Sequence, residues 1–199
     1  MTEEQLGLLL AGVVGYLVGS VSPAALLARA RGVDLRHTGS GNPGATNAGR
    51  AMGRRVGVVV AVLDVAKGLL PALLFGLVVG EPAGLVAGAA AVLGHVTSPW
   101  LHGRGGKGVA TSLGAVLGVA PLWGLAALAV FGLVFWVSRW VALSSVVATL
   151  ALPLLAAVAL LAGWPSGSVA RLVWAAFLAG VVVVRHRGNF AAWRREHAG

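Results

Sequence analysis

Residues 109–137 read VATSLGAVLGVAPLWGLAALAVFGLVFWV, and no Asp, Glu, Lys or Arg interrupts them. A transmembrane helix needs about 20 apolar residues to cross a hydrocarbon core of about 30 Å, so this run is too long for one upright helix. Pro121 stands near its middle, and a proline removes a helical hydrogen bond and clashes with the preceding turn. The run therefore predicts two short helices that are hinged at Pro121.

The composition of the whole chain is that of a membrane protein. Of its 199 residues, 58% are hydrophobic and 11% are charged, whereas a soluble domain has about 45–50% apolar and about 25% charged residues. Gly is more frequent in membrane helices than in soluble ones, and the chain has 30 glycines. It has no cysteine, which excludes disulfides and thiolate nucleophiles. The length predicts one domain over residues 1–199.

Further apolar runs are candidates to cross the membrane. They are Leu6–Leu27, Val56–Val79, Ala83–Val96, Trp140–Leu161 and Val169–Val184. Glu3 and Glu4 stand where a secretory signal peptide has basic residues, so the first run is interpreted as a retained helix. With the hinged pair, the runs predict an all-α integral membrane protein of about seven transmembrane helices, two of them short, with Gly-rich cytoplasmic loops.

The basic residues gather in segments that the predicted helices place on one side of the membrane. These segments are the stretch after the first run, the Gly-rich stretch at 104–108, Arg139 and the tail after Val184. The turns at 80–82 and 163–168 contain no basic residue. The positive-inside rule therefore predicts a multi-pass protein with its N-terminus outside and its C-terminus in the cytoplasm; five spans would satisfy the same rule.

The first polar segment, residues 38–50, reads TGSGNPGATNAGR. Its glycines let an anion approach the backbone N–H groups, and hydroxyl and amide side chains add further donors. Those side chains are Ser40, Asn42, Thr46 and Asn47. Arg50 can grip a phosphate with two hydrogen bonds. A turn-rich loop without a ligand has a similar composition, so a phosphate site and a plain loop both remain open.

The second polar segment, residues 104–111, reads RGGKGVAT and runs into the long apolar stretch. A helix N-terminus preceded by glycine and lysine can hold a phosphate. The candidate ligands are Arg104, Gly105, Gly106, Lys107 and Gly108. The Walker A spacing is absent, which argues against nucleotide binding. A basic loop that touches lipid headgroups is the alternative interpretation.

The third polar segment, residues 185–190, reads RHRGNF and follows the last apolar run. Arginines at a membrane exit are often only an orientation signal. His186 and Asn189 are three residues apart, so they share one face if the helix continues. An imidazole and an amide could then reach the same ligand.

Polar residues within the apolar runs are interpreted as structural. Asp64 and Lys67 are three apart, and pairing with each other accounts for two charges inside the membrane. His95 is predicted to be a hydrogen-bonded packing residue. Ser144 and Ser145 are typical of residues that pack helices together.

Several classes of chemistry have no motif in this chain. It contains no H-E-x-x-H and no clustered carboxylates, so neither a metal nor a cofactor is expected. It contains no G-x-S-x-G of a serine hydrolase. Nucleic-acid binding is not expected either, because the basic residues are confined to one membrane face.

In order and spacing, these segments resemble the PlsY family, the bacterial membrane acyl-phosphate:glycerol-3-phosphate acyltransferases, along nearly the whole chain. The matching stretches are 39–47 with Arg50, 64–68, Gly94-His95 with Pro99, 105–111, and 185–187 with Asn189. The resemblance implies an enzyme of the bacterial plasma (inner) membrane whose active site lies at the cytoplasmic face. The expected reaction moves a fatty acyl group from acyl phosphate to glycerol 3-phosphate and yields 1-acyl-glycerol 3-phosphate (lysophosphatidic acid) and phosphate, the first acylation step of phospholipid synthesis.

The family's functional residues carry over to positions in this chain. The resemblance implies that Ser40 and Arg50 bind and orient a phosphate-bearing substrate, and that the loop with Lys107 holds phosphate. It implies that His186 and Asn189 complete the site, with His186 either a general base or a positioning group. Ser145 matches a polar position in the family's sixth helix. The expected partners are the two substrates and membrane lipids, and nothing in the sequence indicates an oligomeric state.

Three positions depart from the family pattern. Arg104 stands where the family usually has Lys, Gly188 replaces a usual Glu, and Ala142 occupies a position that is commonly Ser. Two other functions remain open on the sequence. One is a transporter for small anions, against which no inverted repeat is evident; the other is a lipid-binding scaffold without catalysis.

Overall fold

The computed structural model describes residues 1–198, and all the regular structure among them is helical. The helices form two compact units, Met1–Val119 and Ala120–Gly199. The expectation of one domain over the whole chain stays a prediction.

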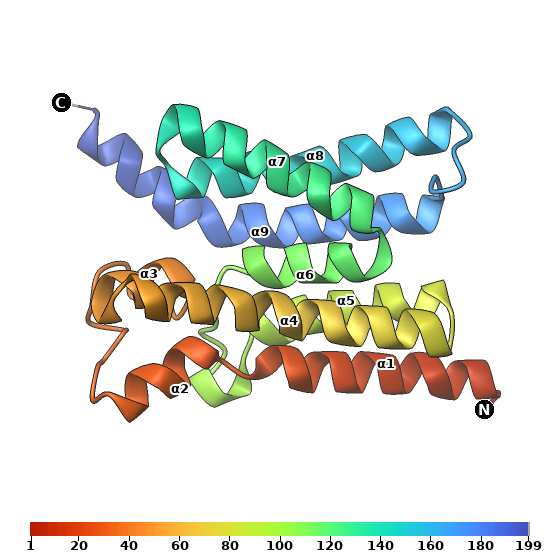
Figure 1. The fold of residues 1–199 in the computed structure, drawn as a ribbon, viewed down its shortest axis with the longest axis horizontal. Coiled ribbons are helices and arrows are strands. Elements are labelled where there is room, and N and C mark those ends of the chain that lie inside the picture. Colours follow the sequence, from red (N-terminus) through yellow and green to blue (C-terminus); the bar gives the residue numbers. More distant parts are fainter. Residues whose placement is uncertain (199) are drawn as a thin grey trace. The chain divides into compact units, whose positions relative to one another are not determined.

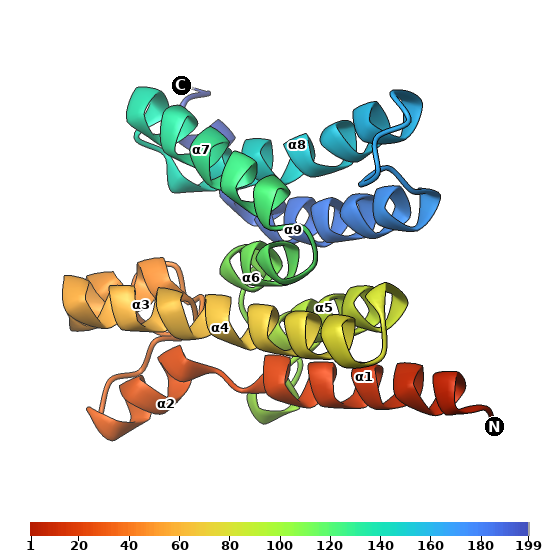
Figure 2. The same ribbon diagram turned by 45° about the vertical axis from the view of Figure 1, so that its right-hand side comes forward.

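The first unit is built around four helices that lie side by side (Figures 1 and 2). They are α1 (Glu3–Ser20), α4 (Arg54–Val78), α5 (Glu81–Val96) and α6 (Val109–Val119). Helix α5 contacts the other three, and α4 also packs against α6. The shorter elements are α2 (Pro23–Ala30), α3 (Ala45–Met52) and the 3₁₀ helix η1 (Pro99–Leu101).

Small residues let these helices approach closely. A Cβ atom on Gly19 of α1 would collide with the backbone of Ala91 on α5, and one on Gly114 of α6 would collide with the carbonyl of Val65 on α4. Helices in a membrane associate through such close contacts because lipid tails are as apolar as the side chains themselves. These two glycines therefore serve helix packing.

The first apolar run is not one continuous helix, so that detail of the sequence interpretation is wrong. Helix α1 ends at Ser20 and α2 begins at Pro23. Between them Val21 and Ser22 are extended, and the Ser22 hydroxyl accepts a hydrogen bond from the Ala25 N–H at 3.3 Å. A serine cap followed by proline at the first helical position is a strong helix start, which explains the break.

The second unit consists of α7 (Pro121–Ser138), α8 (Val141–Leu161) and α9 (Val169–Glu196). Helix α8 packs against both α7 and α9. The predicted break at Pro121 is confirmed, because α6 ends at Val119 and α7 starts at the proline. The last apolar run was expected to leave the membrane near Val184, and the helix that contains it continues to Glu196.

The described residues contain six segments that are long and apolar enough to cross a membrane, and Val109–Val119 is a shorter apolar helix. This agrees with the predicted all-α membrane fold. Large apolar side chains lie on outer faces, including Val78 and Leu122, which are 82% and 77% exposed. Such faces suit lipid, whereas much of the buried interior is alanine.

Candidate active site

The loop before α3 is organised by Asp34. Its carboxylate accepts hydrogen bonds from the Arg36 N–H at 2.8 Å and from the His37 ring nitrogen Nδ1 at 2.8 Å. The Thr38 hydroxyl donates to the Asp34 carbonyl at 2.7 Å. The bond from His37 and then that from Arg36 hold the pKa of Asp34 below its ordinary value, although Asp34 is exposed.

Asn47 fixes the chain around Ser40. This asparagine is 1% exposed, and its amide nitrogen donates to the carbonyls of Leu35 at 3.2 Å and Thr38 at 2.9 Å. Its side-chain oxygen accepts from the Ser40 N–H at 3.1 Å. Gly39 has φ +57°, and a Cβ atom there would collide with the Asn47 side-chain oxygen. The Asn47 amide thus holds the loop backbone, and substrate binding by this residue stays a prediction.

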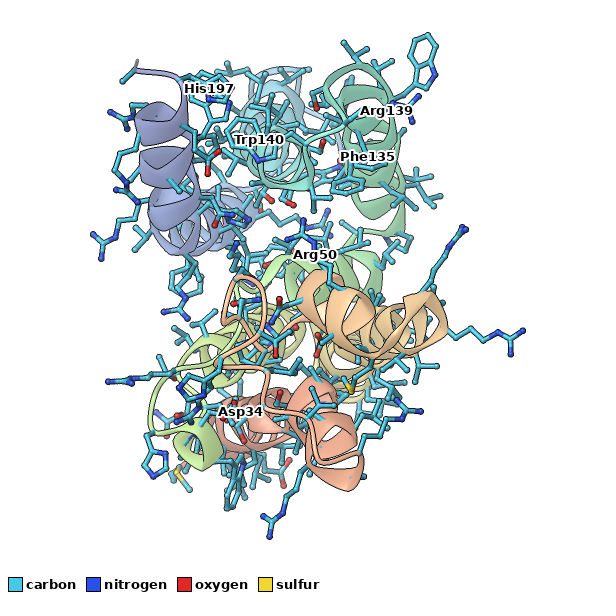
Figure 3. All side chains as sticks on the ribbon, turned by 90° about the vertical axis from the view of Figure 1, so that its left-hand side faces the viewer. Asp34, Arg50, Phe135, Arg139, Trp140 and His197 are labelled. Carbon is cyan, nitrogen blue, oxygen red and sulfur yellow. The ribbon has the colours of Figure 1, made fainter. Side chains whose placement is uncertain are left out.

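The other candidates of the first segment lie at the surface of unit 1. Ser40 sits between two glycines with positive φ and is exposed. Thr46 lies exposed in the first turn of α3, and Arg50 lies exposed in its last turn. Figure 3 shows Arg50 and Asp34 well apart within the unit. Asn42 is half-buried, and its amide nitrogen lies 2.7 Å from where a Cβ atom on Gly44 would stand.

The Gly-rich loop is packed onto the end of α5. The Gly105 N–H donates to the Val96 carbonyl at 3.2 Å, and the Gly106 N–H donates to the His95 carbonyl at 3.1 Å. Both glycines are buried. Their N–H groups therefore donate hydrogen bonds to carbonyls at the end of α5. The loop then continues to Lys107 and to the first turn of α6.

Lys107 and Gly108 stand where the loop becomes a helix. Lys107 is half-buried, and Gly108 adopts φ +85° immediately before α6 begins at Val109. The N-terminal turn of a helix carries partial positive charge and N–H groups that have no partner within the helix. A lysine next to such a turn creates a local environment that favours a phosphate.

Arg104 lines a basic pocket of about 600 Å³ in the same unit. Arg29 and Arg36 are in the pocket wall as well, together with Asp34 and the apolar side chain of Leu101. The Arg36 guanidinium donates to the Leu101 carbonyl at 3.5 Å. The excess of positive charge makes this pocket attractive to anions.

In unit 2 the remaining candidates lie on α8 and α9. Helix α9 does continue through His186 and Asn189, so the expected shared face is present. His186 is 2% exposed and its Nδ1 atom lies 2.8 Å from the Val182 carbonyl. A carbonyl only accepts hydrogen bonds, so Nδ1 carries the proton. The Ser145 hydroxyl donates to the Val141 carbonyl one turn earlier, at 2.7 Å.

An aromatic cluster joins the end of α9 to the start of α8. The Trp140 ring lies 5.1 Å from Phe190 and 5.6 Å from Trp193, measured between ring centroids. Trp193 stacks on His197 at 4.7 Å, and Figure 3 shows Trp140 and His197 near each other in unit 2. These contacts explain why α9 extends beyond the predicted membrane exit at Val184. The sequence interpretation did not recognise them.

The family is decided by comparison with known proteins. A family model described as "Glycerol-3-phosphate acyltransferase" matches residues 9–196. The chain belongs to this family. Two curated relatives, both named glycerol-3-phosphate acyltransferase, support the assignment. The protein from Geotalea daltonii is 44% identical over 90% of this chain and 90% of its own length, and that from Geobacter sulfurreducens is 45% identical over 91% of each.

Solved structures of this acyltransferase family have the same fold. The chain is similar to the crystal structure of PlsY, an integral membrane glycerol 3-phosphate acyltransferase, in its glycerol 3-phosphate form, with a TM-score of 0.86 and 37% identity. It is similar to the lysophosphatidic acid form of PlsY with a TM-score of 0.84 and 36% identity. Each match covers 96% of this chain and 92% of the other. The PlsY resemblance found in the motifs is thereby confirmed.

The departures from the family pattern can be located in the acyltransferase fold. Gly188 is exposed on α9, and a Cβ atom on it would meet nothing within 4 Å. A longer side chain therefore has room there. Ala142 is buried in the first turn of α8, where the neighbouring Ser144 hydroxyl donates to the Trp140 carbonyl at 2.9 Å.

Proposed function

We propose that this protein transfers a fatty acyl group from acyl phosphate to glycerol 3-phosphate. The observation that carries the proposal is the exposed Ser40, held between two left-handed glycines by the Asn47 amide, with Arg50 exposed further along the chain on α3. A hydroxyl, a guanidinium and a helix start within one short segment are groups that bind phosphate. The crystal structures of PlsY in its glycerol 3-phosphate form and in its lysophosphatidic acid form support the same acceptor and product.

The proposed reaction requires no covalent nucleophile. An acyl phosphate is a mixed anhydride, so phosphate is already a good leaving group. The glycerol 3-phosphate hydroxyl attacks the acyl carbonyl, the new ester C–O bond forms, and the bond between the acyl carbon and the phosphate oxygen breaks. The hydroxyl proton passes to a base and the released phosphate keeps the bonding electrons. The absence of cysteine from the sequence is compatible with this route.

The residues then have two tasks, namely holding anions and limiting the motion of the reacting groups. Arg50, Lys107 and the α6 N-terminus attract the phosphates, and positioned hydrogen-bond donors stabilise charge that develops on the carbonyl oxygen.

His186 has a defined role to test. With the proton on Nδ1, the Nε2 atom of the neutral ring accepts a proton, whereas an imidazolium would only donate hydrogen bonds to a phosphate.

The proposal also includes an orientation in the bacterial plasma membrane. Arg50, Lys107 and the basic end of α9 belong to segments that the positive-inside rule places in the cytoplasm. The N-terminus is then outside. Both phosphorylated substrates would reach the enzyme from the cytoplasmic side, while the acyl chain stays between apolar surfaces.

The test uses purified protein in detergent with palmitoyl phosphate and glycerol 3-phosphate, and palmitoyl-CoA as a parallel donor. We expect phosphate release that depends on glycerol 3-phosphate, with lysophosphatidic acid formed only from the acyl phosphate. Arg50→Ala should lower kcat/KM by about 10- to 100-fold, the effect of losing a hydrogen bond to a charged group. The matched control is Arg54→Ala, which removes another exposed arginine, from the start of α4. Activity with the CoA donor alone would overturn the proposed donor, and equal losses in both variants would overturn the role of Arg50.

A further inference from the structure

Three ionisable side chains meet in the interior of unit 1. Asp64 and Lys67 on α4 and His95 on α5 are 3%, 6% and 6% exposed. The Asp64 Oδ1 atom lies 2.9 Å from Lys67 Nζ and 3.6 Å from His95 Nδ1. The predicted pair of Asp64 with Lys67 is therefore confirmed, and His95 joins it. Charges within membrane segments are costly, and they are generally retained for a specific task.

One side of this cluster holds the break between α1 and α2. Lys67 Nζ donates a hydrogen bond to the Val21 carbonyl at 2.7 Å. The Ser98 hydroxyl, just after α5, donates to the Ser20 carbonyl at 2.6 Å, and the Trp100 indole donates to the Ser20 hydroxyl at 2.9 Å. The last residues of a helix have carbonyl groups without helical partners. At the end of α1 such carbonyls accept hydrogen bonds from α4 and from the segment that leads to the Gly-rich loop.

The other side of the cluster supports the Gly-rich loop. The Gly106 N–H bonds the His95 carbonyl at 3.1 Å, and a Cβ atom on Gly106 would collide with the His95 ring. A Cβ atom on Gly105 would collide with the His95 carbonyl oxygen. The loop therefore rests on the backbone and ring of His95 with no space between them. The ring is therefore in close contact with the loop that leads to Lys107.

We propose that Asp64, Lys67 and His95 are positioning residues for the Gly-rich loop. Asp64 lies 3.6 Å from His95 Nδ1, and Lys67 contacts both Asp64 and the Val21 carbonyl, so the position of the loop is linked to the α1–α2 break. The cluster itself touches no substrate. The effect of the cluster on activity rests on the proposed function, in which Lys107 and the α6 N-terminus hold phosphate. The effect of the cluster on the position of the loop does not depend on that function.

The competing explanation is that the cluster only stabilises the fold. A label on the loop can distinguish this explanation from loop positioning. The protein has no native cysteine, so a single His102→Cys substitution can carry a nitroxide spin label. His102 is exposed and lies at the end of η1, two residues before Arg104. The mobility of the label reports the order of the loop without any substrate.

The variants are chosen to keep the fold. Asp64→Asn/Lys67→Met removes both charges together, because removing one would leave the other buried and unpaired. His95→Leu puts an apolar side chain in the same place and loses the polar contact to Asp64, whereas His95→Gln keeps a polar side chain with an N–H donor. Val60→Ala is the control, since Val60 is fully buried one turn earlier on α4 and belongs to a different cluster of the core.

We expect the double variant and His95→Leu to show a more mobile label and at least a roughly tenfold rise in KM for glycerol 3-phosphate, with kcat changed less than KM. His95→Gln should restore both values toward the wild type. Val60→Ala should lower the unfolding temperature without changing label mobility. If the double variant does not fold, the comparison of His95→Leu with His95→Gln decides whether the cluster positions the loop.

Two outcomes overturn the inference. One is an unchanged label spectrum in His95→Leu, and the other is a mobile label with an unchanged KM. A wild-type protein without acyltransferase activity would overturn the proposed function instead, and the label spectra would still decide whether these residues position the loop.

Discussion

The Asn47 side-chain oxygen accepts a hydrogen bond from the Ser40 backbone N–H at 3.1 Å, while the amide nitrogen of the same side chain bonds two carbonyls of the loop. One buried asparagine on α3 therefore sets the backbone on which the exposed Ser40 is displayed. Asparagine suits this position because its side chain donates and accepts hydrogen bonds at the same time.

Asn47→Asp tests this relationship. An ionised aspartate has nearly the same shape but cannot donate, so the carbonyls of Leu35 and Thr38 lose their partner. We expect the free energy of unfolding to fall by about 1–3 kcal/mol. Denaturant unfolding in micelles measures it, with Thr46→Ala, an exposed neighbour on the same helix, as the control that should stay within about 0.5 kcal/mol of the wild type. Equal stability of the two variants would contradict the prediction.

The pKa of Asp34 gives a pH-dependent prediction. The hydrogen bond from His37 stabilises the ionised carboxylate, which lowers the pKa in the folded state. A lowered pKa means that this local stabilisation is present above the ordinary Asp value of about 3.9 and is lost as pH falls through the lower folded value. In His37→Ala the Asp34 carboxyl should titrate at a higher pH than in the wild type.

Carbon NMR of protein labelled at aspartate carboxyls measures that midpoint. Asp34→Asn identifies the signal by its disappearance. A midpoint that does not move in His37→Ala would show that His37 does not hold the carboxylate.

The aromatic cluster of unit 2 predicts how the end of α9 is held. Trp140→Ala removes the ring contacts to Phe190 and Trp193, and each aromatic pair contributes about 0.5–1.5 kcal/mol beyond the area that it buries. We expect the unfolding free energy to fall by about 1–3 kcal/mol and backbone amides after Phe190 to exchange faster. Hydrogen exchange followed by mass spectrometry measures the second effect.

Trp136→Ala is the matched control for this experiment. Trp136 is 68% exposed in the last turns of α7, so its loss should leave exchange at the end of α9 unchanged. Faster exchange in both variants would mean that the tryptophan contacts are not what holds the helix end.

Gly188 predicts a stabilising substitution. It lies inside α9 with open space where the methyl group of an alanine would stand, and glycine within a helix is less favourable than alanine by about 0.5–1 kcal/mol. Gly188→Ala should therefore raise the free energy of unfolding by that amount, and Gly188→Glu should fold as well. Thermal unfolding in detergent measures both. Gly106→Ala is the contrasting control, because its Cβ atom collides with the His95 ring and should destabilise the protein.

Much of the fold follows from the sequence because a bilayer imposes length and polarity on each segment. The apolar runs, the break at Pro121 and the pairing of Asp64 with Lys67 depend on residues that are neighbours in the chain. The α1–α2 break also has a local signal, Ser22 followed by Pro23, which the sequence interpretation passed over in favour of the long apolar run. The three polar segments that are candidates to bind phosphate were visible for the same reason, since their residue types and spacing are local.

Only the tertiary structure decides what each polar group in those motifs bonds. The Asn47 amide and the N–H groups of Gly105 and Gly106 were expected to offer donors to an anion, but they bond the loop and the end of α5. The extension of α9 likewise depends on Trp140, which is far away in the sequence. A sequence pattern records which donors and acceptors a segment has, whereas their partners depend on distant segments that folding brings within hydrogen-bonding or ring-contact distance.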